Sequence, residues 1–115
     1  MKLPTYLAVL LVLVMALFAC QPATESPKQV VQVWLNHMAA GDISKAMELS
    51  APTTREILQV WQTEGFNLYK DAAFEQIHIE MQSDSLAVAS FLLNGEQSDL
   101  QAVKLEGKWL VQMVK

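Results

Sequence analysis

Cysteine, glycine and basic side chains are scarce in this 115-residue sequence. Cys20 is the only cysteine, so no disulfide can form within the chain. The four glycines each have an explanation as a helix end or a turn, and none belongs to a glycine-rich phosphate loop. Once Lys2 is set aside, seven basic side chains stand against twelve acidic ones, a formal charge of −5. This charge argues against nucleic acid or an anionic lipid surface as an electrostatic partner.

Patterns for metal or nucleophilic chemistry are also missing from the sequence. His37 and His78 are 41 positions apart and have no nearby cysteine ligands, so they do not form a common zinc motif. The methionines are scattered, which does not favour a copper site. None of the serines lies in a nucleophile-elbow pattern. The sequence therefore predicts no metal and no cofactor.

Apolar residues are concentrated at the N-terminus. Residues 1–19 contain a single charge, Lys2, and residues 6–19 contain none. This run is shorter than the roughly 20 apolar residues that a membrane-spanning helix needs. A short positive start followed by such a run is typical of a secretory signal peptide, so we expect residues 1–19 to be removed.

The end of this run, Leu17-Phe18-Ala19-Cys20, resembles a bacterial lipobox. The resemblance implies that Cys20 receives a diacylglyceryl thioether, that the signal is cut before it, and that its new amino group is acylated. Two or more acyl chains hold a protein stably on a membrane. Gln21 follows the cysteine in place of Asp, which by resemblance to lipoprotein sorting in Gram-negative bacteria points to the periplasmic leaflet of the outer membrane.

The rest of the chain predicts one domain of residues 26–115, joined to Cys20 by the polar linker 21–25. Apolar residues first recur at helical spacing. The predicted helices run from Pro27 to Gly41 with Ser26 as cap, from Asp42 to Ser50, and from a Thr53/Glu56 capping box to Gly65.

From Phe74 onward the apolar period changes to two, as in β-strands. The predicted strands cover residues 74–82, 86–93, 100–105 and 109–114, and Asn94-Gly95 is a strong hairpin signal. We therefore expect an α+β fold in which N-terminal helices pack on a curved four-stranded antiparallel meander.

The order of these elements resembles the nuclear transport factor 2-like superfamily, the cystatin-like cone folds. The resemblance is carried by the long first helix that ends at Gly41-Asp42, by the run Ile43–Met47 and by the hairpin sequence Glu106-Gly107-Lys108-Trp109. It implies that the first helix crosses the concave face of the sheet and leaves a conical pocket. Some members use that pocket for catalysis and many for binding. No catalytic motif of the family matches this chain, so no catalytic residue is assigned.

Six residues are candidates for the pocket of such a cone. The tryptophans fall on apolar sets, so they either pack in the core or line a ligand site. His37 is either a general base or a residue on the flank of the first helix, and Tyr69 with Asp71 either binds a polar ligand or belongs to a polar loop. The candidates are Trp34, His37, Trp61, Tyr69, Asp71 and Trp109. We expect a small ligand-binding or protein-binding module, with a small enzyme as the alternative.

The strands carry more apolar residues than one helical layer can cover. Both alternating sets of residues 86–93 are apolar, and so are both sets at the C-terminal strand. We expect the second face to make a protein contact or a homodimer, with Phe91 and Leu110 as candidate interface residues. The alternative is that strong curvature of the sheet, or the last strand and loops, covers this face.

The lipobox generates the first prediction. Protein extracted from membranes should begin at Cys20 and carry acyl chains, because the charge-free run ends at this cysteine. Intact mass spectrometry measures both properties. The Cys20→Ser variant should be released or remain an unprocessed precursor. A wild-type chain that starts at Met1 and has a free Cys20 thiol would refute the prediction.

Overall fold

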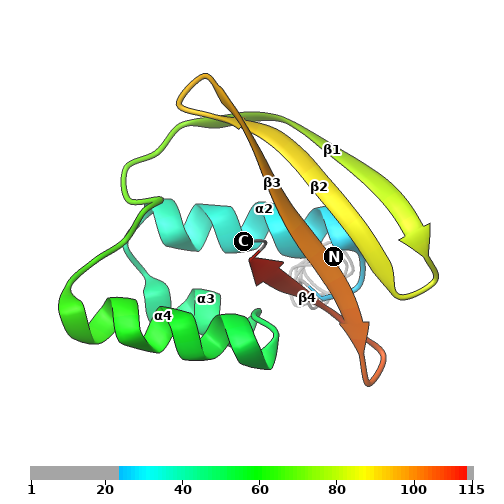
Figure 1. Cartoon of the computed structure of the whole chain (residues 1–115), viewed down its shortest axis with the longest axis horizontal. Coiled ribbons are helices and arrows are strands. Elements are labelled where there is room, and N and C mark those ends of the chain that lie inside the picture. Colours follow the sequence, from blue (N-terminus) through cyan, green and yellow to red (C-terminus); the bar gives the residue numbers. More distant parts are fainter. Residues whose placement is uncertain (1–23, 114–115) are drawn as a thin grey trace, which may run out of the picture.

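The computed structural model describes residues 24–113 (Figure 1). The predicted signal peptide of residues 1–19, the predicted lipidation of Cys20, the predicted sorting role of Gln21 and the predicted end of the last strand at Val114 lie outside the described residues. The elements are α2 (Pro27–Ala39), α3 (Ile43–Glu48), α4 (Pro52–Glu64), β1 (Phe74–Ser83), β2 (Leu86–Leu93), β3 (Glu96–Leu105) and β4 (Lys108–Met113). The expected α+β class, helices first and strands second, is confirmed.

The start of α2 follows the predicted chemistry. The Ser26 hydroxyl accepts a hydrogen bond from the backbone N–H of Gln29 at 3.2 Å, and Pro27 occupies the first turn. Asp42 precedes α3 as expected, but its side chain makes no capping hydrogen bond. It lies 3.5 Å from Lys45 Nζ instead.

The predicted capping box at Thr53 and Glu56 is wrong. Helix α4 begins at Pro52, and its N-cap residue Ala51 makes no side-chain hydrogen bond. Proline at the first helical position needs no partner for an N–H, and the Ala51 N–H is bonded to the sheet through the carbonyl of Val111 at 2.8 Å. Tertiary pairing, which local sequence does not reveal, therefore sets this helix start. Gly65 ends α4 in the left-handed conformation, with φ of 71°.

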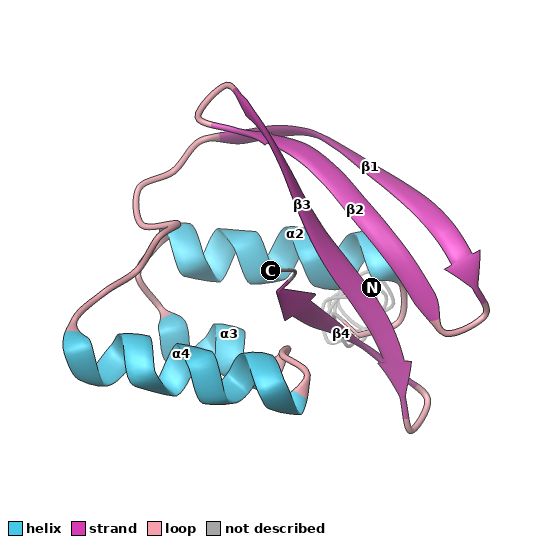
Figure 2. Ribbon diagram, in the orientation of Figure 1, coloured by secondary structure: helices cyan, strands magenta, loops and turns pink. Residues whose placement is uncertain are grey.

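The four strands form an open antiparallel meander in the order β1-β2-β3-β4 (Figure 2). Asn94 and Gly95, with φ of 51° and 83°, make the expected two-residue turn, and Leu93 pairs directly with Glu96. Strand β3 consequently begins at Glu96, four residues earlier than Leu100, where the prediction started it. Residues 96–99 are polar, so they lack the apolar alternation of a strand, but their backbone still pairs with β2.

A bulge in β1 keeps its apolar side chains on one face. The pairing with β2 shifts between Glu75 and His78, and Gln76 has a positive φ of 56°. Because side chains alternate along a strand, Phe74 and Ile77 would otherwise point to opposite faces. Both pack against the core, which is possible because the bulge inserts one residue between them.

Helix α2 lies across the concave face of the sheet and contacts all four strands (Figure 1). The strand residues beneath it include Ala87, Ala89 and Ala102, all fully buried. These small side chains leave room for Trp34 and Leu35 of α2, which are also fully buried. The core therefore combines large helix residues with small strand residues.

The edge of β4 is closed by three other segments of the chain. Every second backbone amide of β4 bonds away from β3. The hydrogen bonds join Trp109 N to Thr24 O (2.9 Å), Val111 N to Leu49 O (2.8 Å), Ala51 N to Val111 O (2.8 Å) and Met113 N to Thr54 Oγ1 (2.9 Å). This edge is therefore not free to pair with another strand.

The indole of Trp34 ties these helices together inside the core. Its Nε1–H donates to Ser50 Oγ at 2.9 Å, and the same hydroxyl donates to the Ala46 carbonyl at 2.7 Å. Trp34 and Ser50 are both fully buried. Among the described residues, no fully buried side-chain nitrogen or oxygen lacks a hydrogen-bond partner.

This buried pair generates the second prediction. In the protein of residues 21–115, Ser50→Ala should lower the free energy of unfolding by about 1–3 kcal/mol, because the Trp34 indole N–H would lose its buried acceptor. Urea unfolding followed by circular dichroism measures the change.

Ser44→Ala is the matched control. The Ser44 hydroxyl accepts from Gln62 Nε2 at 2.8 Å on the exposed surface. Its loss should change stability by less than about 0.5 kcal/mol. Equal effects of the two substitutions would contradict the role of Ser50.

Candidate functional site

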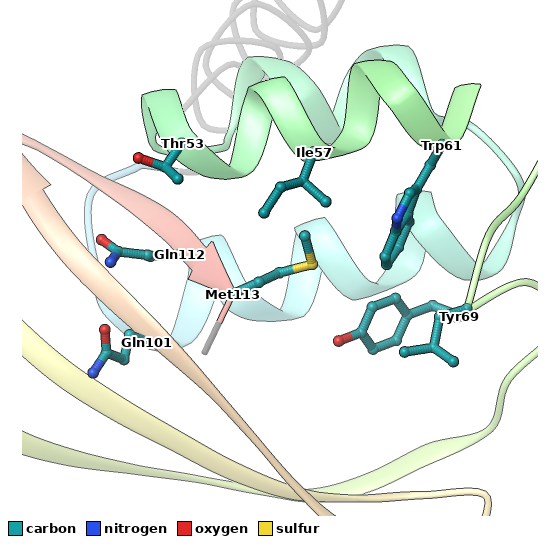
Figure 3. A pocket seen from close by; sticks show the side chains of 8 residues that line it. Thr53, Ile57, Trp61, Tyr69, Gln101, Gln112 and Met113 are labelled. Atoms are coloured by element: carbon teal, nitrogen blue, oxygen red, sulfur yellow. The ribbon is translucent and has the colours of Figure 1, made fainter. Parts of the chain in front are cut away.

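A pocket of about 470 Å³ lies between α4 and the end of β4 (Figure 3). Its walls come from α4, from the connection between α4 and β1, and from the two last strands. The lining residues are Thr53, Ile57, Trp61, Leu68, Tyr69, Gln101, Gln112 and Met113. Its volume lies within the range of small-molecule sites.

The position of α4 explains why a space remains here. Helix α2 contacts all four strands, whereas α4 contacts β4 and α3 only. Thr53, Ile57 and Trp61 recur every four residues, so they share one side of α4. This side faces β3 across the gap, and Figure 3 shows the Ile57 and Trp61 side chains directed into it. The pocket therefore exists because α4 covers only the β4 edge of the sheet.

The connection after α4 places Tyr69 at the inner end of the pocket. Asn67 fixes this connection, because its Nδ2 donates to the Met38 carbonyl at 2.8 Å and its Oδ1 accepts from the Tyr69 N–H at 2.9 Å. The Asp71 N–H donates to the Ala39 carbonyl at 2.9 Å. The connection is thus docked on the C-terminal end of α2, and Tyr69 is held against the core.

Four aromatic rings run from the core to the surface beside this pocket. The ring of Tyr69 meets Trp34 edge-on at a centroid distance of 5.2 Å and lies 6.4 Å from the ring of Trp61. Trp61 in turn meets Phe66 edge-on at 5.0 Å. These distances are those of favourable aromatic pairs. Because Trp34 is fully buried and Phe66 is 48% exposed, the row links the core to solvent.

The described residues that line the pocket carry no charge at neutral pH. Within residues 24–113, Tyr69 is the only ionisable side chain that lines it. Burial raises the pKa of Tyr69 above its ordinary value of 10.0, so its hydroxyl keeps its proton at neutral pH. Gln101 and Gln112 are directly paired across β3 and β4 and present two neighbouring amides. The site can therefore offer amide and hydroxyl hydrogen bonds beside an apolar wall.

The structure brings two of the six sequence candidates into this pocket, Trp61 and Tyr69. Trp34 lies behind Tyr69 in the core. His37 is half-buried on the flank of α2, and Asp71 is exposed in the connection, so neither lines the pocket. Trp109 is at the opposite end of β4, where Lys104 Nζ lies 6.0 Å from the centroid of its ring.

The two candidate interface residues lie on opposite faces of the sheet. Phe91 is 2% exposed and belongs to the core beneath α2, so its assignment to an exposed face is wrong. Phe91 belongs to the same alternating set of β2 as the buried Ala87 and Ala89. Because both alternating sets of β2 are apolar, the sequence alone does not show which set faces the core. Leu110 has the other parity and lies partly exposed on the outer face.

Six lining residues were not anticipated: Thr53, Ile57, Leu68, Gln101, Gln112 and Met113. The usable signal was a glutamine in each of two mainly apolar segments, residues 100–103 and 109–113. A two-residue turn at Glu106-Gly107 pairs Leu105 with Lys108, and counting back from this pair places Gln101 opposite Gln112. Nothing local could have placed α4 beside them.

The described part of the chain shows no cluster of three or more His, Cys, Asp or Glu residues that could hold a metal ion. No helix between Thr24 and Met113 is long and apolar enough to cross a membrane. Comparison with models of protein families and with curated proteins finds no match to this chain.

The buried phenol generates the third prediction. In residues 21–115 Tyr69 is the only tyrosine, so its ionisation can be followed by absorbance. It should ionise above pH 10.0, because burial disfavours the phenolate. Its contribution to stability is complete below the pKa of unfolded tyrosine and is lost as the pH rises through the folded pKa. The urea-unfolded protein, which should titrate near pH 10, is the control. Coincident titration curves would contradict the burial of this hydroxyl.

Proposed function

We propose that the protein is a bacterial envelope lipoprotein whose domain is a cystatin-like cone that binds a small uncharged ligand. The cone assignment is supported by the open curved sheet with α2 across its concave face. The anchor assignment is supported by the lipobox at residues 17–20, which follows a charge-free apolar run. Gln21 supports the periplasmic leaflet of the outer membrane as the location.

The observation that carries the binding function is the uncharged lining that residues 24–113 give the pocket. Ile57, Trp61 and Met113 form an apolar wall, and Gln101 with Gln112 provides amide donors and acceptors. An ionic ligand would lose its hydration here without gaining a counter-charge from the lining. The ligand class is therefore a neutral molecule with an apolar or aromatic part and one hydrogen-bonding group.

The competing function, a small enzyme, has less support. General acid–base catalysis needs a group that exchanges protons near the operating pH. The raised pKa of Tyr69 leaves it a hydrogen-bond donor at neutral pH, and neither histidine of the described region lines the pocket. We therefore propose a binding module, with no catalytic residue assigned.

The proposal requires the membrane as a partner, and the protein would be attached to it through lipid on Cys20. Nucleic acid is not proposed, since the formal charge of the whole chain is −4. A protein partner or a second copy on the outer face of the sheet, around Leu110, stays a prediction.

The fourth prediction tests the neutral pocket with N-phenyl-1-naphthylamine, an uncharged fluorescent amphiphile. Residues 21–115 should bind it saturably. Ile57→Glu should weaken binding at least about tenfold, because a carboxylate in the pocket must be desolvated when the probe enters. Probe fluorescence measures the affinity.

Val60→Glu is the matched control on the same helix. Val60 is 52% exposed and does not line the pocket, so this variant should bind as the wild type does. Equal loss in both variants would show that the probe does not bind in this pocket. Binding that never saturates would count against a ligand site of any kind.

A further inference from the structure

The first described residue, Thr24, lies at the edge of β4 and limits how far from the domain an anchor at Cys20 can be. The Thr24 carbonyl accepts a hydrogen bond from the Trp109 N–H at 2.9 Å. Only residues 21–23 separate Thr24 from Cys20. Four residue steps span at most about 14 Å even when fully extended. If Cys20 carries lipid, the membrane surface therefore lies within about this distance of Thr24, which is bonded to the start of β4.

A groove of about 460 Å³ opens at this end of the domain, between the start of α4 and the hairpin that joins β3 to β4. Leu105, on the hairpin, is 42% exposed, and Leu110 is partly exposed. The lining residues are Glu48, Pro52, Arg55, Leu105, Glu106, Lys108 and Leu110.

An apolar row extends this groove over the outer face of the sheet. Leu86 pairs with Val103, and Val103 pairs with Leu110, so the three side chains are neighbours across β2, β3 and β4. All three are partly exposed. Helix α2 covers the other face, where Ala87, Ala102 and Val111 are fully buried. None of the described helices therefore covers this row.

The charges of the groove are balanced. Arg55 is held by the carbonyls of Met47 and Ser50, each at 3.2 Å, and lines the groove together with Lys108. Two carboxylates, Glu48 and Glu106, offset these two cations. Attraction to anionic lipid is therefore not the driving force, and apolar contact with the interface is the favourable term.

We propose that this groove, with the apolar row beside it, is the surface that the domain lays on the lipid bilayer. The proposal rests on lipidation of Cys20, which brings the bilayer to this end. Pro52 and Arg55 lie on the side of α4 opposite to Thr53, Ile57 and Trp61, because successive helical residues turn by 100°, so the groove and the pocket open on different sides of this helix. On the sheet, Gln101 and Gln112 share the outer face with Val103 and Leu110, so the proposed bilayer surface ends beside these two amides.

Spin labels on the full-length lipidated protein test this orientation. A lipidated Cys20 does not react with a thiol reagent, so a Leu105→Cys variant carries the only reactive thiol. The matched control is Leu68→Cys, which is 57% exposed in the connection that docks on the C-terminal end of α2. Helix α2 separates the two ends by about 20 Å. Both proteins are placed in vesicles of phosphatidylethanolamine and phosphatidylglycerol, and collision of the label with oxygen and with a water-soluble nickel chelate is measured.

The label at position 105 should collide more with oxygen and less with nickel than the label at position 68. The ratio should stay the same at high salt, because the groove charges cancel. Equal, water-like ratios at the two positions in a lipidated protein would overturn the bilayer contact alone.

Two further outcomes would also overturn it. Protection of position 105 with spin–spin broadening that disappears on dilution with unlabelled protein would assign the surface to a second copy of the chain. A second label on Cys20, together with an intact mass without acyl chains, would overturn both the lipid anchor and the bilayer contact.

Discussion

The buried indole N–H of Trp34 is the constraint on which the arrangement of the helices depends. A donor this deep in the core must have an acceptor, and Ser50 supplies it at 2.9 Å. Ser50 lies between α3 and α4, so the bond holds their junction against α2. The residues on either side of it, Leu49 and Ala51, then pair with Val111 at the edge of β4. One polar contact thus fixes both the place where α4 starts and the edge of the sheet.

The candidate pocket follows from the same constraint. With its start held at β4, α4 runs beside the sheet and leaves a space in front of β3. Tyr69 closes the inner end of this space because its ring packs against Trp34. The pocket and the groove beside the hairpin lie on opposite sides of α4, whereas on the outer face of the sheet Gln101 and Gln112 lie next to Val103 and Leu110.

The sequence was sufficient wherever local chemistry decides the structure. Pro27 with Ser26 predicted the start of α2, and Asn94-Gly95 predicted the central hairpin. It was insufficient where distant segments decide. The start of α4 depends on pairing with Val111, and the bulge at Gln76 depends on which face α2 covers. In the pocket, Trp61 and Tyr69 could be proposed from residue type alone, because aromatic side chains commonly line ligand sites. Gln101 and Gln112 become candidates only when the register of β3 and β4 is known.

Hydrogen exchange of the Trp34 indole N–H, followed by NMR, measures the strength of this constraint in the native protein. If the bond to Ser50 holds the helices together, this proton should exchange only when the whole domain unfolds, and its opening free energy should equal that of the amides at the centre of β2. An opening free energy several kcal/mol lower, with the β2 amides still protected, would show that the helices separate locally and that Ser50 does not hold them in place.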